Sequence, residues 1–330
     1  MQLYISKENL QVLISNLADT YKIFYPDTNL LYTEYLKNNP LNLNIDGIRP
    51  LVPLKTFFFN NGRNISNLDE NIKQKIIFGV KSCDLKALEI LDKIFLEGVV
   101  VDPFYDINRK NTVIITSDCI EVCETCFCTL VGNKPYSESG YDINLTFIDN
   151  GYICETGTQK GEEIVKKNHT LFGSISEKVI SLRDKQREKV INKLKEINIE
   201  FEKLFNIEYQ KLLKDNYNSD QWNSLSEKCV QCMGCNFICP SCFCFFLHET
   251  KNFNKIRYWD GCHSTSYARV AGGANPRPKL YERFRNRYQC KLNNRKENFN
   301  VYACTGCGRC IQVCPAKIDI RKVLTQLVKV

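Results

Sequence analysis

The sequence has no long apolar run, few histidines and no nucleotide-binding fingerprint. No stretch approaches the roughly 18 consecutive apolar residues of a transmembrane helix, so we expect no membrane insertion. The N-terminal MQLYISKENL lacks a basic segment followed by an apolar one, so we expect no signal peptide. Three histidines leave little for a His-rich metal site, and neither G-x-G-x-x-G nor a P-loop is present. Because no acid, base or nucleophile stands out, we expect a chain without a catalytic residue of its own.

Cysteine, in contrast, is abundant, with 18 in 330 residues. Two runs read Cys-x2-Cys-x2-Cys-x3-Cys-Pro, and they consist of Cys229, Cys232, Cys235 and Cys239, and of Cys304, Cys307, Cys310 and Cys314. Bacterial ferredoxins use this spacing for [4Fe-4S] clusters, and the fourth cysteine of each run ligates the other cluster. The spacing therefore predicts two clusters, one held by Cys229, Cys232, Cys235 and Cys314, the other by Cys304, Cys307, Cys310 and Cys239.

A structural zinc protein is the alternative, because zinc ribbons also use Cys-x2-Cys pairs. Two complete four-cysteine runs, each followed by proline, favour the clusters. The length of the chain and its cysteine usage fit a reducing compartment, and we expect a cytoplasmic protein. The formal charge of +8 does not indicate a nucleic-acid partner. Each cluster with its four thiolates adds about −2, so two clusters would leave about +4.

A second cysteine group is predicted in the N-terminal half. KIIFGV at 75–80 and TVIIT at 112–116 are typical of buried strands, and the first is followed by the helical pattern LKALEILDKIF. Cys83 and Cys119 come just after these strands, where sites form in parallel α/β sheets. Cys126 and Cys128 would complete four thiolates, and Cys123 is a spare or a competitor for Cys119. The alternative is that these cysteines are small buried apolar residues.

The remaining cysteines fall into two classes. Cys154 lies inside the probable strand GYICET and is interpreted as core, within a hairpin over 143–156. The 64 residues between the two runs suit helices that bridge them, and they contain Cys242, Cys244, Cys262 and Cys290. These four indicate either a further cluster or ordinary core packing. His263, next to Cys262, could hydrogen-bond a sulfur.

We therefore expect an α/β N-terminal domain that carries an iron–sulfur site, followed by a mainly α-helical two-cluster ferredoxin domain. The expected segments are 1–157 for the α/β domain, 158–220 for a solvated helical connector and 221–330 for the ferredoxin domain.

Several segments resemble one family. They are FGVKSCDLKALEILDKIF, the CFC at 126–128, CPSCFC at 239–244, DGC at 260–262, AGGANPRP with the RFRNRYQC that follows, and CTGCGRCIQVCPAKI. Together they resemble the β subunit of soluble sulfhydrogenases, which are cytoplasmic [NiFe] hydrogenase complexes of anaerobes. The pattern is also similar to the electron-transfer subunit of the anaerobic sulfite reductase. The likeness is clearest over residues 75–130 and 225–325.

The resemblance implies an iron–sulfur electron-transfer protein within a larger complex. Such a protein relays electrons between a subunit that binds flavin and NAD(P) and a catalytic subunit, here most simply that of a hydrogenase, with sulfite reductase as the alternative. The family pattern has cysteines that match Cys83, Cys119, Cys126 and Cys128, which adds a third cluster, and others that match Cys242, Cys244 and Cys262. Cys290 resembles the sulfhydrogenase branch, and Cys123 is not part of the pattern.

Overall fold

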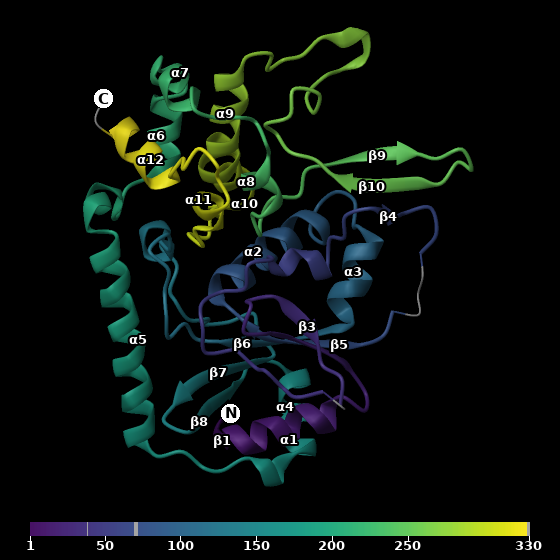
Figure 1. Cartoon of the computed structure of the whole chain (residues 1–330), viewed down its shortest axis with the longest axis vertical. Helices are drawn as coiled ribbons and strands as arrows, with labels where there is room; N and C mark the ends of the chain where they lie inside the picture. The colour runs from purple at the N-terminus through teal and green to yellow at the C-terminus, as the bar shows by residue number, and fades with distance from the viewer. Residues whose placement is uncertain (38, 69–71, 329–330) are drawn as a thin grey trace.

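The N-terminal half of the chain is built on a seven-stranded sheet (Figure 1). The computed structural model describes residues 1–37, 39–68 and 72–328, so residues 38, 69–71 and 329–330 of the expected domains lie outside the described part. The strand order is β1-β8-β7-β6-β5-β2-β3, with β2, β5, β6 and β7 mutually parallel and the others antiparallel at the edges. The strands are β1 (Gln2–Ser6), β2 (Lys22–Pro26), β3 (Tyr32–Glu34), β5 (Lys75–Val80), β6 (Thr112–Ser117), β7 (Ile143–Ile148) and β8 (Gly151–Thr156).

Helices cover both faces of this sheet, as expected for an α/β region. Apolar residues of α1 (Lys7–Leu17) and α4 (Gln159–Lys167) share one core with the strands. Those of η1 (Leu54–Phe57), α2 (Ser82–Phe95) and α3 (Pro103–Lys110) form a second core on the other face. The predicted strand–helix unit after residue 75 and the 143–156 hairpin are both present.

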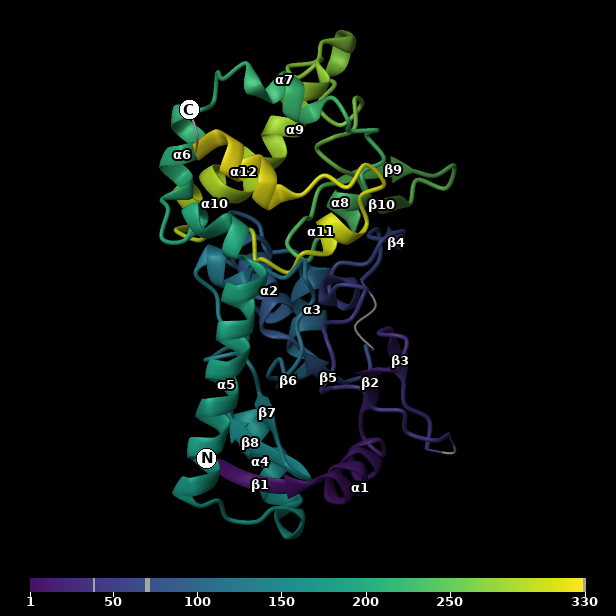
Figure 2. The ribbon, with the colours of Figure 1, turned by 60° about the vertical axis from the view of Figure 1, so that its left-hand side comes forward.

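Residues 158–220 link the two halves of the chain and also pack against the α/β half. They contain α4, η3 (His169–Leu171), α5 (Glu177–Ile197), η4 (Ile199–Leu204) and α6 (Tyr209–Asp215). α4 belongs to the α/β core, and α5 runs along the side of the sheet up to the C-terminal half (Figure 2). On α5, Arg183 and Arg187 are largely buried and pair with Glu155, and Arg187 also pairs with Asp118. α5 is therefore held against the α/β region by ion pairs, although its sequence looks solvated.

The C-terminal half consists of short helices and one hairpin. Its elements are α7 (Gln221–Ser226), α8 (Gly234–Phe237), β9 (Phe245–Glu249), β10 (Lys255–Trp259), η5 (Ala271–Gly273), α9 (Leu280–Gln289), the π-helix turn η6 (Cys290–Asn294), α10 (Arg295–Phe299), α11 (Arg309–Gln312) and α12 (Ile320–Val328). β10 also pairs with β4 (Arg63–Asn64), so the two halves share a small sheet. None of the described helices has the length and apolarity needed to cross a membrane.

Candidate iron–sulfur sites

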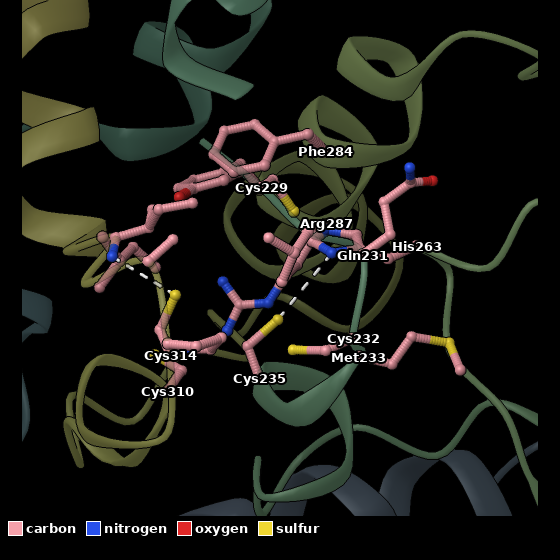
Figure 3. Close-up of a pocket in the computed structure, with 16 residues that line it drawn as sticks. Cys229, Gln231, Cys232, Met233, Cys235, His263, Phe284, Arg287, Cys310 and Cys314 are labelled. Carbon is pink, nitrogen blue, oxygen red and sulfur yellow. Dashed lines mark hydrogen bonds between the residues drawn. The ribbon is translucent and has the colours of Figure 1, made fainter. Parts of the chain in front are cut away.

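The first predicted ligand set gathers in one pocket of the C-terminal half (Figure 3). Three cysteines come from the loop before and the start of α8, and the fourth follows α11; they are Cys229, Cys232, Cys235 and Cys314. The rest of the lining is mostly apolar and includes Phe284 and Tyr288. Cys232 is solvent-exposed, so this set lies close to the protein surface.

The second predicted set is more deeply buried. Cys239, Cys304 and Cys307 are buried, and Cys310 is half-buried. Burial and the neighbouring Cys310 sulfur raise the pKa of Cys304 to about 12. Burial also raises the pKa of Cys310 to about 11, and the sulfurs of Cys307 and Cys239 contribute in the same direction. The four sulfurs that the ferredoxin spacing assigns to one centre are therefore mutual neighbours.

The N-terminal set comes together at the carboxyl ends of β5 and β6. Cys83, Cys119, Cys126 and Cys128 line one pocket, and Cys307 of the second set lines it too. Cys83 is in the first turn of α2, and Cys119 follows β6 by two residues. The parallel pairing of these two strands brings their ends to one edge, as expected.

Two glycines let this N-terminal loop touch the second ferredoxin run directly. Gly306 and Gly308 have φ of +69° and +73°, and a Cβ on Gly306 would stand 2.4 Å from the Cα of Cys128. A Cβ on Gly308 would stand 2.1 Å from the Thr125 carbonyl oxygen. The Phe127 N–H donates to the Gly306 carbonyl at 2.8 Å. Glycine is required at both positions because only hydrogen fits between the two backbones.

The four spacer cysteines are also neighbours. Asn236 Nδ2 lies 3.3 Å from Cys262 Sγ and 3.9 Å from Cys242 Sγ. Burial raises the pKa of Cys262 to about 11, and the sulfurs of Cys244 and Cys290 add to this rise. Cys242 in turn hydrogen-bonds to Cys239 of the second set, which helps to hold the pKa of Cys239 well below its usual range.

The second set therefore has a neighbouring set on three sides. Cys307 lines the N-terminal pocket, Cys310 lines the pocket of the first set, and Cys239 contacts Cys242 of the spacer group. We call Cys239, Cys304, Cys307 and Cys310 the central set from here on. The central set is therefore the one that neighbours each of the other three in the part of the chain that the structure describes.

Buried cations face these sulfurs without a carboxylate partner in the part of the chain that the structure describes. Arg287 lies between Cys235 and Cys310, and its Nε atom has no hydrogen-bond partner there (Figure 3). Arg49 is buried near the N-terminal set, donates to the Cys307 carbonyl, and has an unpartnered Nη1. An unpaired buried cation is costly, so this arrangement fits sites that hold anionic groups. A [4Fe-4S] cluster with four thiolates is such a group.

Lysines supply the same kind of charge at the spacer group and the central set. Lys291 Nζ donates to Cys239 Sγ at 3.0 Å. Lys55 Nζ donates to the Cys242 carbonyl at 2.9 Å and lies 4.2 Å from the centre of the Trp259 ring. Sequence reasoning missed all four of these cations. Only the basic run around Cys290 gave a signal, since it contains Arg287 and Lys291.

Three other residues of the sequence analysis can be placed. Cys154 packs in the core of the sheet, among apolar neighbours. Cys123 is outside the lining of the N-terminal pocket, but its thiol hydrogen-bonds with that of Cys126, which together with Arg49 lowers its pKa to about 6. His263 Nδ1 lies 3.9 Å from Cys235 Sγ. Burial lowers the pKa of His263 to about 3, so the ring is neutral.

Within the described ranges, no three Cys, His, Asp or Glu side chains converge closely enough to bind one metal ion. The cysteines of a cubane each bind a different iron, so they stand farther apart than the ligands of one ion. The absence of a single-ion site is therefore compatible with cysteines that surround a cluster.

Comparison with known proteins agrees with these sites. The model of a 4Fe-4S dicluster domain matches residues 228–318. The chain is 32% identical over 297 residues to Sulfhydrogenase 2 subunit beta of Pyrococcus furiosus, and the match spans 86% of this chain and 85% of that protein. This chain belongs to the sulfhydrogenase β-subunit family. The F420-dependent formate dehydrogenase subunit beta of Methanocaldococcus jannaschii is 24% identical over 190 residues, which is 57% of this chain and 40% of that protein.

Membership in the sulfhydrogenase β-subunit family gives the chain its general role. It is an iron–sulfur electron-transfer subunit of a hetero-oligomeric oxidoreductase complex, and it binds [4Fe-4S] clusters. The likeness covers the α/β half as well as the ferredoxin runs, so the N-terminal cysteines belong to the shared region.

Proposed function

We propose that this chain relays electrons between a subunit that binds flavin and NAD(P)H and the catalytic subunit of a cytoplasmic sulfhydrogenase-type [NiFe] hydrogenase. The observation that carries the proposal is the likeness to a sulfhydrogenase β subunit over 86% of the chain. The proposed segments remain 1–157, 158–220 and 221–330, with a mainly helical ferredoxin domain in the last.

The proposed ligands form four sets. They are Cys229, Cys232, Cys235 and Cys314; the central set; Cys83, Cys119, Cys126 and Cys128; and Cys242, Cys244, Cys262 and Cys290. When bound, a [4Fe-4S] cluster accepts and returns a single electron. The chain's own residues hold these groups close together, bury the central set, and place Arg49, Arg287, Lys55 and Lys291 beside the sulfurs. The buried cations reduce the cost of holding several negative groups within one small protein.

The ligand sets are tested by counting iron and acid-labile sulfide in anaerobically purified protein. Four clusters give about sixteen irons per chain, three give about twelve, and two give about eight. Cys83→Ser should lower the count by up to four, because it removes a thiolate of the N-terminal set. Cys154→Ser, a change at a buried cysteine of the sheet core, is the matched control and should leave the count unchanged. Equal counts in both variants would remove the N-terminal cluster from the proposal.

The partners are tested by native co-purification under anaerobic conditions, followed by mass spectrometry. A flavin subunit together with a nickel-binding large subunit is the expected result. A formate dehydrogenase subunit in their place would favour a second candidate function, that of an electron-transfer subunit of a formate dehydrogenase. The partial likeness to a formate dehydrogenase β subunit supports this candidate. A sirohaem protein would instead make the chain an electron-transfer subunit of a sulfite reductase.

A further inference from the structure

Lys291 lies in an unusual turn of the C-terminal half. The π-helix turn η6 separates α9 from α10 and contains both Cys290 and Lys291. Such turns are rare and are frequent at functional sites, because the extra residue redirects the side chains that follow. Here Cys290 neighbours Cys244 and Cys262, while the next residue, Lys291, is buried with its Nζ at the central set. One turn thus serves two of the cysteine sets.

The ammonium of Lys291 is fixed by a closed network of contacts. Its Nζ donates to Cys239 Sγ at 3.0 Å and to Ser241 Oγ at 3.1 Å. The Ser241 hydroxyl donates to the Ala303 carbonyl, so its oxygen is free to accept from Lys291. The Ala303 N–H donates to the Lys291 carbonyl at 2.7 Å. Both ends of the residue are therefore anchored next to the ligand loop of the central set.

The charge on Lys291 has no carboxylate to neutralise it among residues 1–37, 39–68 and 72–328. Lys291 is buried, and its ammonium faces the Cys239 sulfur directly, with only the Ser241 hydroxyl as a further side-chain partner among the described residues. An ammonium held on a ligand sulfur stabilises added negative charge there more than elsewhere, because the interior screens it weakly. Arg287 is a second buried cation nearby, and it lies between Cys310 of the central set and Cys235 of the first set.

The other sets receive no such contact from a lysine in the part of the chain that the structure describes. Lys55 donates to a backbone carbonyl beside the spacer group, and Arg49 donates to the Cys307 carbonyl and to Gln312 near the N-terminal set. The charge-assisted bond to a sulfur therefore distinguishes the central set. Hydrogen bonds to sulfur and net local charge are the protein's main means of setting a cluster's reduction potential.

We propose that Lys291 makes the central set the most easily reduced centre of the chain, so that an electron entering from any of the three neighbouring sets comes to rest there. The proposal rests on the proposed function, since it requires clusters at these cysteines. The step is a one-electron reduction of the centre. In the test, dithionite supplies the electron, and no proton is transferred.

The test is a redox titration followed by electron paramagnetic resonance, on anaerobically purified full-length protein with mediators. Lys291→Met keeps the length of the side chain and removes its charge. One centre should then titrate at lower potential, and its ratio of reduced to oxidised form at the wild-type midpoint should fall about tenfold, the typical worth of one charge-assisted hydrogen bond. Lys291→Arg retains the positive charge, so the midpoint of this centre should stay close to its wild-type value. Lys75→Met, a change at a buried lysine of β5 that donates to Asn108 and to the Phe57 carbonyl, should leave every midpoint in place.

Each result of this titration has a defined meaning. Full iron content with unchanged midpoints in Lys291→Met overturns the tuning role and leaves the proposed function standing. If Lys291→Met loses iron, Lys291→Gln, which retains a neutral N–H donor, is titrated instead. A lowered midpoint in Lys291→Gln supports the proposal, and loss of iron from both variants overturns it. A wild-type chain without iron and sulfide would refute the proposed function itself.

Discussion

At the scale of single residues, Gly308 decides how closely the two halves of the chain approach each other. Gly308→Ala should push the loop around Thr125 away, because its Cβ would stand 2.1 Å from a backbone oxygen. We expect the iron count to fall by up to four, with loss from the N-terminal set, whose ligands flank this loop. Iron analysis measures the fall in the count, and electron paramagnetic resonance shows which centres remain.

Gly272→Ala is the matched control for this change. Gly272 has a φ of +81°, so alanine there has the same backbone strain, roughly 1–2 kcal/mol. Among the described residues, nothing beyond the two chain neighbours of Gly272 lies within 4 Å of the added Cβ, so no loop is displaced. An equal loss of iron from both variants would show that strain alone, without the contact to Thr125, causes the effect.

The sequence predicted how the cysteines group into ligand sets, but it did not predict the buried cations beside them, and the difference has a physical reason. Cluster ligands recur at fixed short spacings, since several thiolates must reach one cluster from a single loop. A positive side chain only has to lie near the cluster in the folded protein, and it can come from any part of the sequence. Arg49 donates to the Cys307 carbonyl although it is 258 residues away in the sequence. Nothing in the residues around Arg49 marks it. The basic run around Cys290 marked Arg287 and Lys291 only.

At the scale of elements, α5 covers the N-terminal cysteine loop. Val190 and Leu194 are buried against Cys128, with Cys119 and Cys126 packed beside them. Leu194→Ala should lower the free energy of unfolding by about 2–5 kcal/mol, the usual range for a buried leucine. It should also speed the loss of iron in air, because water and oxygen then reach the N-terminal set. Denaturant unfolding and the rate of bleaching measure the two effects.

Leu182→Ala on the same helix is the control, since this side chain is exposed. It should change neither the unfolding free energy nor the bleaching rate by much. Faster bleaching in both variants would mean that α5 acts through its helical stability and not as a cover.

The pattern of α5 predicted a helix but not its environment. Its few apolar residues and many charges are typical of a solvated connector. The structure instead buries Arg183 and Arg187 against carboxylates of the α/β half. Periodicity detects an apolar face, whereas a face held by ion pairs has the same composition as a solvated one. The strand pairing and the hairpin were predictable because their signal is apolar.

At the scale of the whole molecule, the depth of each set predicts the order in which oxidants destroy the centres. Cys232 of the first set is exposed, whereas three of the four cysteines in the central set are buried. The contacts that cover the central set come from distant segments, since Arg309 binds the Pro50 carbonyl in the loop before η1 and Asp84 in α2. Sequence spacing could not give this order, because it records neighbours along the chain only.

Limited treatment with ferricyanide should therefore remove iron from the first set before the central set. Access controls the rate, since the oxidant is a charged molecule that cannot enter a packed interior. Magnetic resonance of samples taken during the treatment follows each signal, and Cys232→Ser identifies the signal of the first set by its altered intensity. If the central signal disappears first, the exposed pocket is not the point of attack. That order would also contradict the tuning by Lys291, because the centre that is most easily reduced is the last one that an oxidant of limited strength attacks.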